Sequence, residues 1–300
     1  MSYELLKEYC AEHEVEIRFD EVMARHTYLK IGGAVDIALF PDEATLQGIV
    51  KLLVCSGIPY VVIGGGTNIL VRDGGLEGAA IFTGRMNNIV RQNEEHIFVQ
   101  SGCSLQKVIS LCSEEGLAGM EGMAGIPGSV GGAISGNAGS FGYEIKDVVT
   151  LADLLMADGS VKSSPGKDLG FGYRKSALPA GSIVLGANMS LKKDDPVDVK
   201  KRTGEFREMK KAAQPLSEHS AGCVFKNAEG DSAGRLIDEA GCKGLRVGGI
   251  EVSRQHANFF INTGKGSASD YLRLLDLVSG KVREKFGIIL EPEIKIIGKN

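Results

Sequence analysis

The chain has 300 residues, and 43% of them are hydrophobic, a share that is ample for a packed core. Its formal net charge of −4 argues against a general nucleic-acid or membrane surface, so we expect any anionic ligand to be held locally. The 41 glycines exceed the roughly 21 that an average usage of about 7% predicts, and this excess needs a structural reason.

The amino-terminal segment and the cysteines indicate the compartment. Residues 1–8 carry acidic side chains and no apolar stretch, unlike a targeting peptide, and no segment approaches the roughly 18 apolar residues of a membrane span. The six cysteines form no C-x-x-C pair and the five histidines are isolated, so we expect neither a disulfide framework nor a metal site. We predict a cytoplasmic, monomeric protein without nucleic-acid or membrane partners.

Along the chain, hydrophobic periodicity predicts a mixture of helices and strands. Asp42 is the expected N-cap of the second helix, and Gly241 is the expected end of the fifth. We expect helices at 2–14, 42–55, 104–116, 192–214, 232–240 and 268–286. We expect strands at 59–63, 69–71, 79–82, 97–100, 148–156, 160–163, 183–190, 258–262 and 288–297.

The helix expected at 192–214 differs in composition from the rest of the chain. Thirteen of its 23 residues are charged, and Pro196 and Pro215 lie near its ends. A helix with so few apolar residues cannot have a buried face of ordinary width. We therefore interpret it as a solvated helix that links two domains.

Glycine is concentrated in two loops. Residues 57–142 hold 19 of the 41 glycines, with one loop at 64–68, directly after a strand, and a second at 125–139. A glycine-rich loop brings backbone N–H groups close to an anion, which suits a phosphate or pyrophosphate. Two such loops favour one long ligand, although tight turns alone would also use glycine.

The common nucleotide-binding and hydrolase motifs are absent from the sequence. Gly64-Gly65-Gly66 is not followed by the second half of a G-x-G-x-x-G fingerprint, and no G-x-x-x-x-G-K-[S/T] occurs. There is also no G-x-S-x-G motif. The sequence therefore supports neither Rossmann nor P-loop chemistry, nor a serine-hydrolase nucleophile.

Three segments together resemble one family of flavoenzymes. The segments Thr27–Gly33, Ile63–Leu70 and Gly125–Ala133 look like those of the UDP-N-acetylenolpyruvoylglucosamine reductases (UDP-N-acetylmuramate dehydrogenases), in the shorter form of the family. The resemblance runs nearly end to end. It implies an α+β protein with an FAD-binding domain of the vanillyl-alcohol-oxidase (PCMH) type in two subdomains, and a smaller C-terminal α+β substrate-binding domain.

The resemblance also implies domain boundaries and cofactors. The FAD-binding domain would be 1–195, with its core at about 28–195, followed by a helical linker at 196–214 and the substrate-binding domain at 215–300. Non-covalent FAD would lie on the two glycine loops, with NADPH as its reductant. The implied cofactor-binding residues are Gly64, Gly65, Gly66, Thr67, Asn68, Gly125, Ile126, Pro127, Gly128, Ser129, Gly131, Gly132 and Ala133.

The reaction implied by the resemblance saturates the enol ether of UDP-N-acetylglucosamine enolpyruvate, a step of peptidoglycan precursor synthesis. NADPH reduces the flavin, flavin N5 passes hydride to the enolpyruvyl group, and a protein acid protonates the adjacent carbon. The family's acid is usually the serine of A-G-S-x-F-K-N-P, and residues 221–228 read A-G-C-V-F-K-N-A. Cys223 is therefore the implied proton donor, since a thiol, with an ordinary pKa of about 8.5, is a stronger acid than an alcohol.

Two further motifs imply the other catalytic residues. Tyr173-Arg174-Lys175-Ser176 resembles the family's Y-R-x-S, in which the arginine helps to stabilise the enolate. Leu290–Lys295 resembles L-E-P-E-V-R, and its second glutamate, Glu293, would orient Arg174, the acid or a water molecule. The implied catalytic set is Arg174, Cys223 and Glu293.

The substrate carries an anionic diphosphate, so cations near these motifs are of interest. The resemblance implies substrate-binding roles for Tyr173, Lys226, Asn227 and Lys243. Ala228 replaces the family's proline, and the chain lacks the extra loop with a tyrosine that closes over substrate in the longer form.

Two other functions stay open at this point. The first keeps the fold but makes the protein an FAD-dependent oxidase or dehydrogenase of another alcohol. The second is a non-catalytic nucleotide-binding protein or wall-assembly scaffold. Turnover with NADPH and the nucleotide sugar, compared with turnover with oxygen and alcohols, separates the first from the reductase, and a protein that takes up no FAD would indicate the second.

Overall fold

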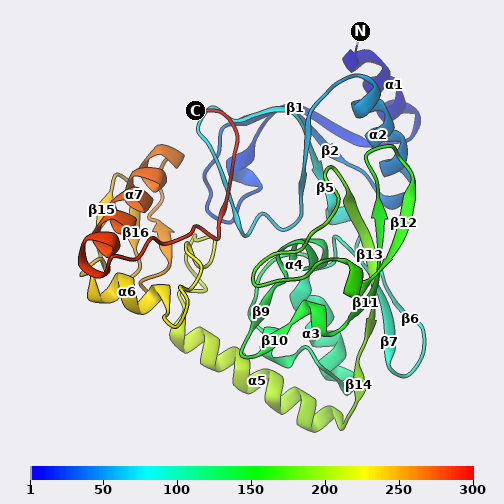
Figure 1. Ribbon diagram of the computed structural model, residues 1–300. Coiled ribbons are helices and arrows are strands. Elements are labelled where there is room, and N and C mark those ends of the chain that lie inside the picture. Colours follow the sequence, from blue (N-terminus) through cyan, green and yellow to red (C-terminus); the bar gives the residue numbers. More distant parts are fainter. Residues whose placement is uncertain (1) are drawn as a thin grey trace. The chain divides into compact units, whose positions relative to one another are not determined.

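The computed structural model describes residues 2–300, so that Met1, the first residue of the segment considered above for targeting, lies outside the described residues. The chain forms two compact units (Figure 1). The first unit contains the described residues up to Phe19, with Ile37–Gly65 and Gly78–Lys210. The second contains Asp20–Asp36, Gly66–Glu77 and Lys211–Asn300. The predicted domain boundaries at 195 and 214 stay a prediction, because the units interleave along the chain.

Both units contain helices and strands. The helices are α1 (Ser2–Glu12), α2 (Glu43–Cys55), α3 (Leu105–Glu114), α4 (Val130–Gly136), α5 (Pro196–Ala213), α6 (Ala233–Glu239) and α7 (Ala268–Phe286). The first strands are β1 (Glu16–Val22), β2 (Ala34–Phe40), β3 (Tyr60–Ile63), β4 (Ile69–Val71), β5 (Leu76–Phe82), β6 (Ile89–Arg91), β7 (His96–Gln100), β8 (Leu117–Ala118) and β9 (Gly139–Ser140). The others are β10 (Tyr143–Glu144), β11 (Val149–Leu155), β12 (Val161–Pro165), β13 (Ile183–Ser190), β14 (Lys192–Lys193), β15 (Arg246–Val247), β16 (Ile250–Val252), β17 (Phe260–Asn262) and β18 (Lys295–Ile297).

One sheet has the strand order β1-β2-β5-β3, with β3 parallel to β5, and most of its residues belong to the first unit. The buried residues of α2 recur at helical spacing, and they share a core with residues of α1 and of β2 and β5. Asp42 caps α2 by accepting a hydrogen bond from the Thr45 amide at 3.0 Å, which confirms the predicted cap.

A second sheet of the first unit is antiparallel, in the order β12-β11-β13-β7-β6. Its core includes Leu105, Val108, Ile109 and Cys112, which lie on one face of α3. The same core contains buried residues of α4 and of the second glycine loop, so this loop is built directly onto the sheet's hydrophobic layer.

The second unit packs the sheet β15-β16-β17 with α6 and α7 around its own core. Helix α7 has the predicted bounds because its end signals are strong: Ser267 and Asp270 form a capping box, and Gly287 ends the helix in a left-handed conformation. The Asp73 carboxylate also accepts hydrogen bonds from the amides of Ala268 (2.8 Å) and Ser269 (2.9 Å) at the helix start.

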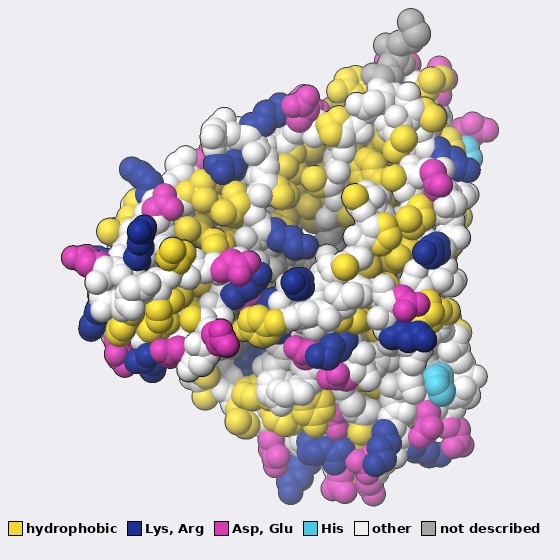
Figure 2. Space-filling model, viewed as in Figure 1, with side chains coloured by type: hydrophobic (Ala, Val, Ile, Leu, Met, Phe, Trp, Pro, Cys, Tyr) yellow, Lys and Arg dark blue, Asp and Glu magenta, His cyan; other side chains and the backbone are white. Residues whose placement is uncertain are grey.

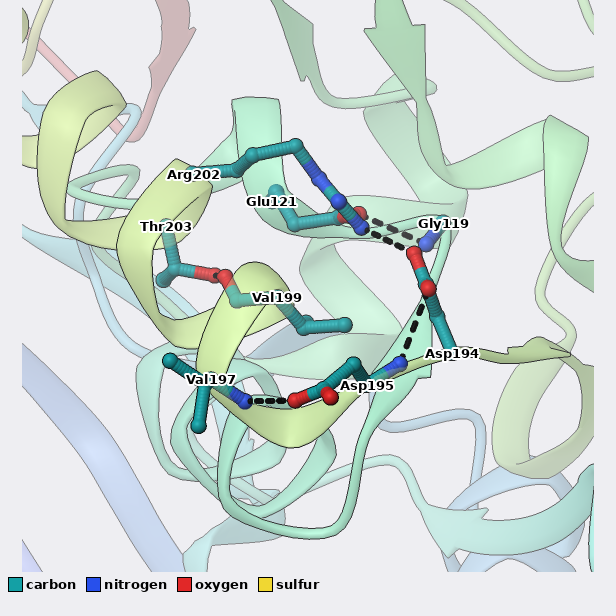
Figure 3. A network of polar contacts seen from close by, with 8 residues as sticks. All are labelled: Gly119, Glu121, Asp194, Asp195, Val197, Val199, Arg202 and Thr203. Carbon is teal, nitrogen blue, oxygen red and sulfur yellow. Dashed lines mark hydrogen bonds and ion pairs between the residues drawn. The ribbon is translucent and has the colours of Figure 1, made fainter.

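Helix α5 is attached to the first unit by ion pairs near its N-terminal end (Figure 3). Arg202 donates to the buried Glu121 at 2.9 Å and to Asp194 at 2.7 Å, and Glu121 also accepts from the Gly119 amide at 2.6 Å. The hydrogen bonds to Asp194 and then Glu121 raise the pKa of Arg202 above its ordinary value. Figure 2 shows acidic and basic side chains side by side around this end of α5, as the charged composition predicted.

The structure corrects several predicted elements. The second glycine loop contains helix α4, whose Val130, Ala133 and Ile134 are buried, so packing outweighs the low helix propensity of its glycines. The strand predicted at 288–297 is observed as β18 and, before it, an isolated antiparallel bridge between Pro292 and Phe225. The helix predicted at 192–214 begins at Pro196, and strands β1 and β2 were not predicted. No helix within residues 2–300 has both the length and the apolar character to cross a membrane.

Candidate functional site

The two glycine loops lie against one another in the first unit. A Cβ atom at Gly65 would be 2.7 Å from the Cα atom of Gly128, and one at Gly64 would be 2.2 Å from Ser129 Oγ. Side chains at these positions would therefore separate the loops. Gly64 and Gly65 remain exposed, so the backbone of the first loop is accessible to a ligand.

Helix α3 holds the second glycine loop in place. The Gln106 side chain donates to the Ile126 carbonyl at 2.8 Å and accepts from the Gly125 amide at 2.8 Å. Ser129 Oγ caps α4 by accepting from the Gly132 amide at 3.3 Å. Sequence reasoning missed Gln106, since nothing in a helix pattern indicates which polar side chain will bond a loop about 20 residues away.

Arg174 lies in a tight turn of the first unit. The Gly172 amide donates to the Lys175 carbonyl at 2.9 Å, and Arg174 itself has a φ of +56°. A residue with a side chain adopts this left-handed conformation at a cost, and such strain is concentrated at functional positions. The guanidinium lies over the ring of Tyr173, 5.4 Å from its centroid, and the tyrosine is 49% exposed.

The turn that carries Arg174 is attached to the end of α4. The buried Asn137 ends this helix in a left-handed conformation, and its side-chain amide donates to the Gly172 carbonyl at 3.0 Å. Ser176, the last residue of the Y-R-x-S segment, donates to the Ser135 carbonyl at 2.9 Å. The second glycine loop and the predicted catalytic arginine therefore belong to one hydrogen-bonded structure.

The charge of Arg174 affects the pKa of a neighbouring carboxylate, that of Glu144. Burial would raise the pKa of Glu144, but hydrogen bonds from Lys146 and Asn137 and the charges of Lys146 and Arg174 lower it overall. This Glu144 carboxylate also accepts from the Asn137 amide at 3.2 Å. Glu144 is thus ionised beside the Arg174 turn, a feature that the sequence did not indicate.

In the second unit, Cys223 belongs to a short extended segment that is held on two sides. On one side Cys223 pairs antiparallel with Phe259, and the Val224 amide donates to the Asn258 carbonyl at 2.9 Å. The Asn258 side chain, which is 2% exposed, accepts from the Phe225 amide at 3.0 Å and donates to the Phe225 carbonyl at 2.8 Å. Asn258 therefore fixes the backbone next to Cys223, and sequence reasoning missed it.

The segment that contains Glu293 pairs with the other side of the Cys223 segment. The Glu293 amide donates to the Val224 carbonyl at 2.8 Å, and Lys226 donates its amide to the Glu291 carbonyl at 2.8 Å. The pairing brings the backbones of the Cys223 and Glu293 segments together, and both side chains are half-buried. Asn68, the last residue of the first glycine loop, donates its side-chain amide to the Glu293 carbonyl at 3.3 Å.

The predicted substrate-binding residues of the second unit all have protein partners. Lys226 makes an ion pair with Glu291 at 2.5 Å, and Lys243 makes one with Asp238 at 2.6 Å. The Asn227 side chain accepts from the Ala233 amide at 3.0 Å and so supports the start of α6. Both lysines are thus paired with carboxylates at the surface of the second unit.

The predicted residues thus form two groups. In the first unit the facing residues of the glycine loops and the Tyr173–Arg174 turn are connected, and in the second Asn68, Cys223, Lys226 and Glu293 lie on adjoining segments. Within residues 2–300, no group of three or more histidine, cysteine or acidic side chains is arranged to hold a metal ion.

The first group fits FAD on structural grounds. The two loops approach so closely that a Cβ atom at Gly65 would clash, while backbone of the first loop stays exposed. Such a surface accommodates a pyrophosphate, because exposed N–H groups can approach its oxygens without side chains in the way.

Two family models match the chain. Residues 37–164 match the FAD binding domain, and residues 214–297 match the C-terminal domain of UDP-N-acetylenolpyruvoylglucosamine reductase. The two matches contain most of the predicted site residues, namely both glycine loops in the first and Cys223, Lys226, Asn227, Lys243 and Glu293 in the second.

Curated relatives match over the whole length. The UDP-N-acetylenolpyruvoylglucosamine reductase of Rubrobacter xylanophilus is 43% identical over 285 residues, which cover 94% of this chain and 95% of the relative. That of Geobacter metallireducens is 41% identical over 300 residues, which cover 100% of both chains.

Solved structures show the same fold. The UDP-N-acetylenolpyruvylglucosamine reductase of Thermus caldophilus has a TM-score of 0.81 at 35% identity, covering 94% of this chain and 98% of its own. BBE-like 1 of Physcomitrella patens has a TM-score of 0.52 at 20% identity, covering 63% of this chain and 44% of its own, and this likeness concerns the fold alone. The predicted α+β class with an FAD-binding domain is confirmed.

Proposed function

The chain belongs to the UDP-N-acetylenolpyruvoylglucosamine reductase family, and from this premise we propose that it reduces UDP-N-acetylenolpyruvoylglucosamine to UDP-N-acetylmuramate. The observation that carries the proposal is identity of about 40% to reductases over the full length, combined with an FAD-binding domain. This favours the reductase over an oxidase of another alcohol or a non-catalytic scaffold. NADPH is the proposed reductant.

The two glycine loops are the proposed FAD site. Residues 64–68 and 125–133 would contact the cofactor, which when bound supplies the hydride for the enolpyruvyl carbon. Gln106 holds the second loop through hydrogen bonds to Gly125 and Ile126, which supports a preformed site. The proposed FAD-binding domain is 1–195, with 196–214 as linker and 215–300 as substrate-binding domain.

Cys223 is the proposed proton donor. A thiol is mostly protonated at neutral pH, so it has a proton to give, and the resulting thiolate is a stable conjugate base. The half-buried position of Cys223 and the fixed backbone of its segment suit this role, since proton delivery requires a positioned acid.

Arg174 and Glu293 are the proposed partners of Cys223. Arg174 has a permanent charge in a planar fork, which suits the negative charge that develops on the substrate after hydride arrives. Its turn is fixed by Asn137 and Ser176, so the charge is preorganised. Glu293 would orient the donor or a water molecule, and its backbone is anchored by Val224 and Asn68.

Lys226, Asn227, Lys243 and Tyr173 are the proposed substrate-binding residues. The ion pairs of Lys226 and Lys243 support this role, because each lysine is held at the protein surface by one exposed carboxylate that a diphosphate can replace. The enzyme would act as a cytoplasmic monomer in peptidoglycan precursor synthesis, and through it in cell shape and division.

Anaerobic stopped flow on the FAD-loaded protein tests the proposal. Cys223→Ala is expected to leave flavin reduction by NADPH intact and to slow reoxidation by the enolpyruvyl nucleotide at least a hundredfold, the scale of general acid catalysis. Cys223→Ser should retain substantial reoxidation, and Cys55→Ala, at an exposed cysteine, should match the unmodified protein.

Two outcomes would contradict parts of the proposal. Equal loss of both half-reactions in Cys223→Ala would refute the role as proton donor. Absence of UDP-N-acetylmuramate after incubation of the unmodified holoenzyme with substrate and NADPH would refute the reductase activity itself.

A further inference from the structure

The segment Thr27–Gly33, one of the three segments that resemble the reductase family, lies against the end of the first glycine loop. The Tyr28 amide donates a hydrogen bond to the Gly66 carbonyl at 2.9 Å. Gly66 has a left-handed φ of +62°, and a Cβ atom there would collide with the carbonyl oxygen of His26. These residues all belong to the second unit. The backbone of residues 26–28 therefore constrains the path of the loop as it leads into β4.

A buried carboxylate holds His26 in place. Glu21 is 6% exposed, and its Oε1 atom accepts a hydrogen bond from Nε2 of the His26 ring at 2.8 Å. The other carboxylate oxygen of Glu21 is 3.6 Å from Arg25, whose side chain is 70% exposed, and an exposed pair of this kind contributes little to stability. A carboxylate with so little contact to water requires hydrogen bonds from the protein. The position of His26 is therefore coupled to Glu21.

The rest of the turn is fixed by other hydrogen bonds. The buried Thr27 hydroxyl donates to the Ile31 carbonyl at 2.8 Å. The side-chain amide of the buried Asn262 donates to the Leu29 carbonyl at 2.8 Å. Residues 27–31 are thus anchored within the second unit, and the hydrogen bond between Glu21 and His26 fixes the end of the turn that touches the glycine loop.

We propose that Glu21 and His26 are positioning residues for the first glycine loop and, through that loop, for FAD. This inference rests on the proposed FAD site at 64–68 and 125–133. The hydrogen bond between the two side chains fixes the His26 carbonyl and the Tyr28 amide, and these two backbone groups hold Gly66 in its left-handed conformation. Both side chains act through the backbone, without a contact of their own with the cofactor.

A glycine-rich loop is the kind of segment that such an anchor affects most. Glycine loses more conformational freedom on ordering than any other residue, so a loop that becomes ordered only when its ligand arrives binds that ligand more weakly. Gly64 and Gly65 are exposed and directly precede Gly66. The hydrogen bond between Glu21 and His26 keeps this part of the loop ordered before FAD binds. Its effect is therefore on FAD affinity rather than on the chemical step.

Titration of the FAD-free, full-length chain with FAD, followed by flavin fluorescence, tests the proposal. His26→Phe keeps a ring but loses the N–H donor, and the dissociation constant for FAD should rise roughly three- to tenfold, the scale of a single hydrogen bond. His26→Gln keeps a side-chain N–H donor and should retain most of the affinity. His96→Phe is the matched control, since the His96 ring forms a hydrogen bond with the Asn93 side chain at 2.9 Å in the first unit.

A double variant separates positioning from stability. Glu21→Met combined with His26→Phe removes both polar groups, so that no buried carboxylate is left without its partner, and the melting temperature should stay close to that of the parent. FAD binding should still weaken as in His26→Phe. Amide hydrogen exchange of residues 63–70 in the FAD-free chain should be faster in both variants, whereas kcat should recover at saturating FAD.

Two outcomes would overturn the proposal. One is an FAD affinity equal to that of the parent in the double variant, and the other is an equal loss of affinity in His26→Gln and His26→Phe. A failure of the proposed FAD site gives a different result, because Gly65→Ala would then leave the FAD affinity unchanged. The exchange rates of residues 63–70 would still show whether the hydrogen bond between Glu21 and His26 orders the loop.

Discussion

The side-chain amide of Asn68 donates to the main-chain carbonyl of Glu293, 225 residues further along the chain, at 3.3 Å. The Lys295 amide donates back to the Asn68 carbonyl at 3.2 Å, and β4 and β18 continue as a parallel pair from this point. The end of the first glycine loop and the segment of the proposed catalytic glutamate are therefore held together as one structural element.

Substitutions of Asn68 test whether its hydrogen bond to the Glu293 carbonyl contributes to turnover. Asn68→Ala removes one hydrogen bond, worth about 1 kcal/mol, and should lower kcat about fivefold at saturating FAD because the Glu293 segment loses its anchor. Asn68→Asp should lower kcat further, since its carboxylate would face the Glu293 carbonyl oxygen. Steady-state turnover with NADPH and substrate measures kcat in both variants. The matched control is Asn87→Ala, because the exposed side-chain amide of Asn87 donates to the Gly84 carbonyl. Unaltered kcat in Asn68→Asp would contradict the prediction.

The close contact between the glycine loops predicts that a side chain at position 65 weakens FAD binding. Gly65→Ala places a Cβ atom 2.7 Å from the Gly128 Cα atom, and the two backbones must move apart. Because such overpacking costs about 1–3 kcal/mol, FAD affinity should fall roughly tenfold or more. Titration of the apoprotein with FAD, followed by flavin fluorescence, gives the dissociation constants. Gly84→Ala, at an exposed glycine with open space around it, should bind FAD normally. Equal FAD affinities in the two variants would refute the proposal that the facing glycine loops bind the cofactor.

We expect substitutions of Arg174 to slow the reaction with substrate while the fold is retained. Arg174→Ala removes the charge that we propose stabilises the developing enolate, and it should lower the reoxidation rate by about 10²–10³. Arg174→Lys should recover only part of this, since lysine lacks the planar fork. FAD binding should persist in both variants. Lys175→Ala, at the next and more exposed position of the turn, is the control, and a comparable loss there would indicate that the turn rather than the guanidinium matters.

His256 predicts a pH dependence of stability. Burial lowers the pKa of His256, and the charge of Lys243 lowers it further, while its Nδ1 atom accepts from the Asn258 amide at 3.3 Å. The unfolded chain therefore binds a proton more readily than the folded one, so stability is full above the ordinary pKa of about 6.5 and falls as the pH decreases through it. Urea unfolding at pH 7.5 and 5.5 should show this loss.

A variant tests whether this dependence comes from His256. His256→Gln should be less stable at pH 7.5 but should lose less on acidification than the unmodified protein. His13→Gln, at an exposed position, should keep the full dependence. If acidification destabilises His256→Gln as much as the parent, another group is responsible.

Local signals in the sequence were enough to predict some of the elements. Helix α7 has the predicted bounds because a capping box and a terminal glycine lie within one turn of its ends, and α2 begins after Asp42 for the same reason. Motif resemblance named Arg174, Cys223 and Glu293, and their catalytic roles remain predictions. The family was likewise evident from short segments and is confirmed by relatives of full length.

Other features depend on contacts between distant segments and become visible only in the folded chain. Helix α4 forms within a glycine-rich segment because Val130, Ala133 and Ile134 reach a core made by other elements, and no local signal announces that burial. Gln106 and Asn258 are ordinary polar residues in the sequence, yet each fixes a functional segment through hydrogen bonds across about 20 to 33 residues. Tyr271 has the pattern of an ordinary core aromatic, and only the structure shows that its hydroxyl has no hydrogen-bond partner within residues 2–300. Such pairings arise from the close packing of remote segments, which periodicity and motifs do not encode.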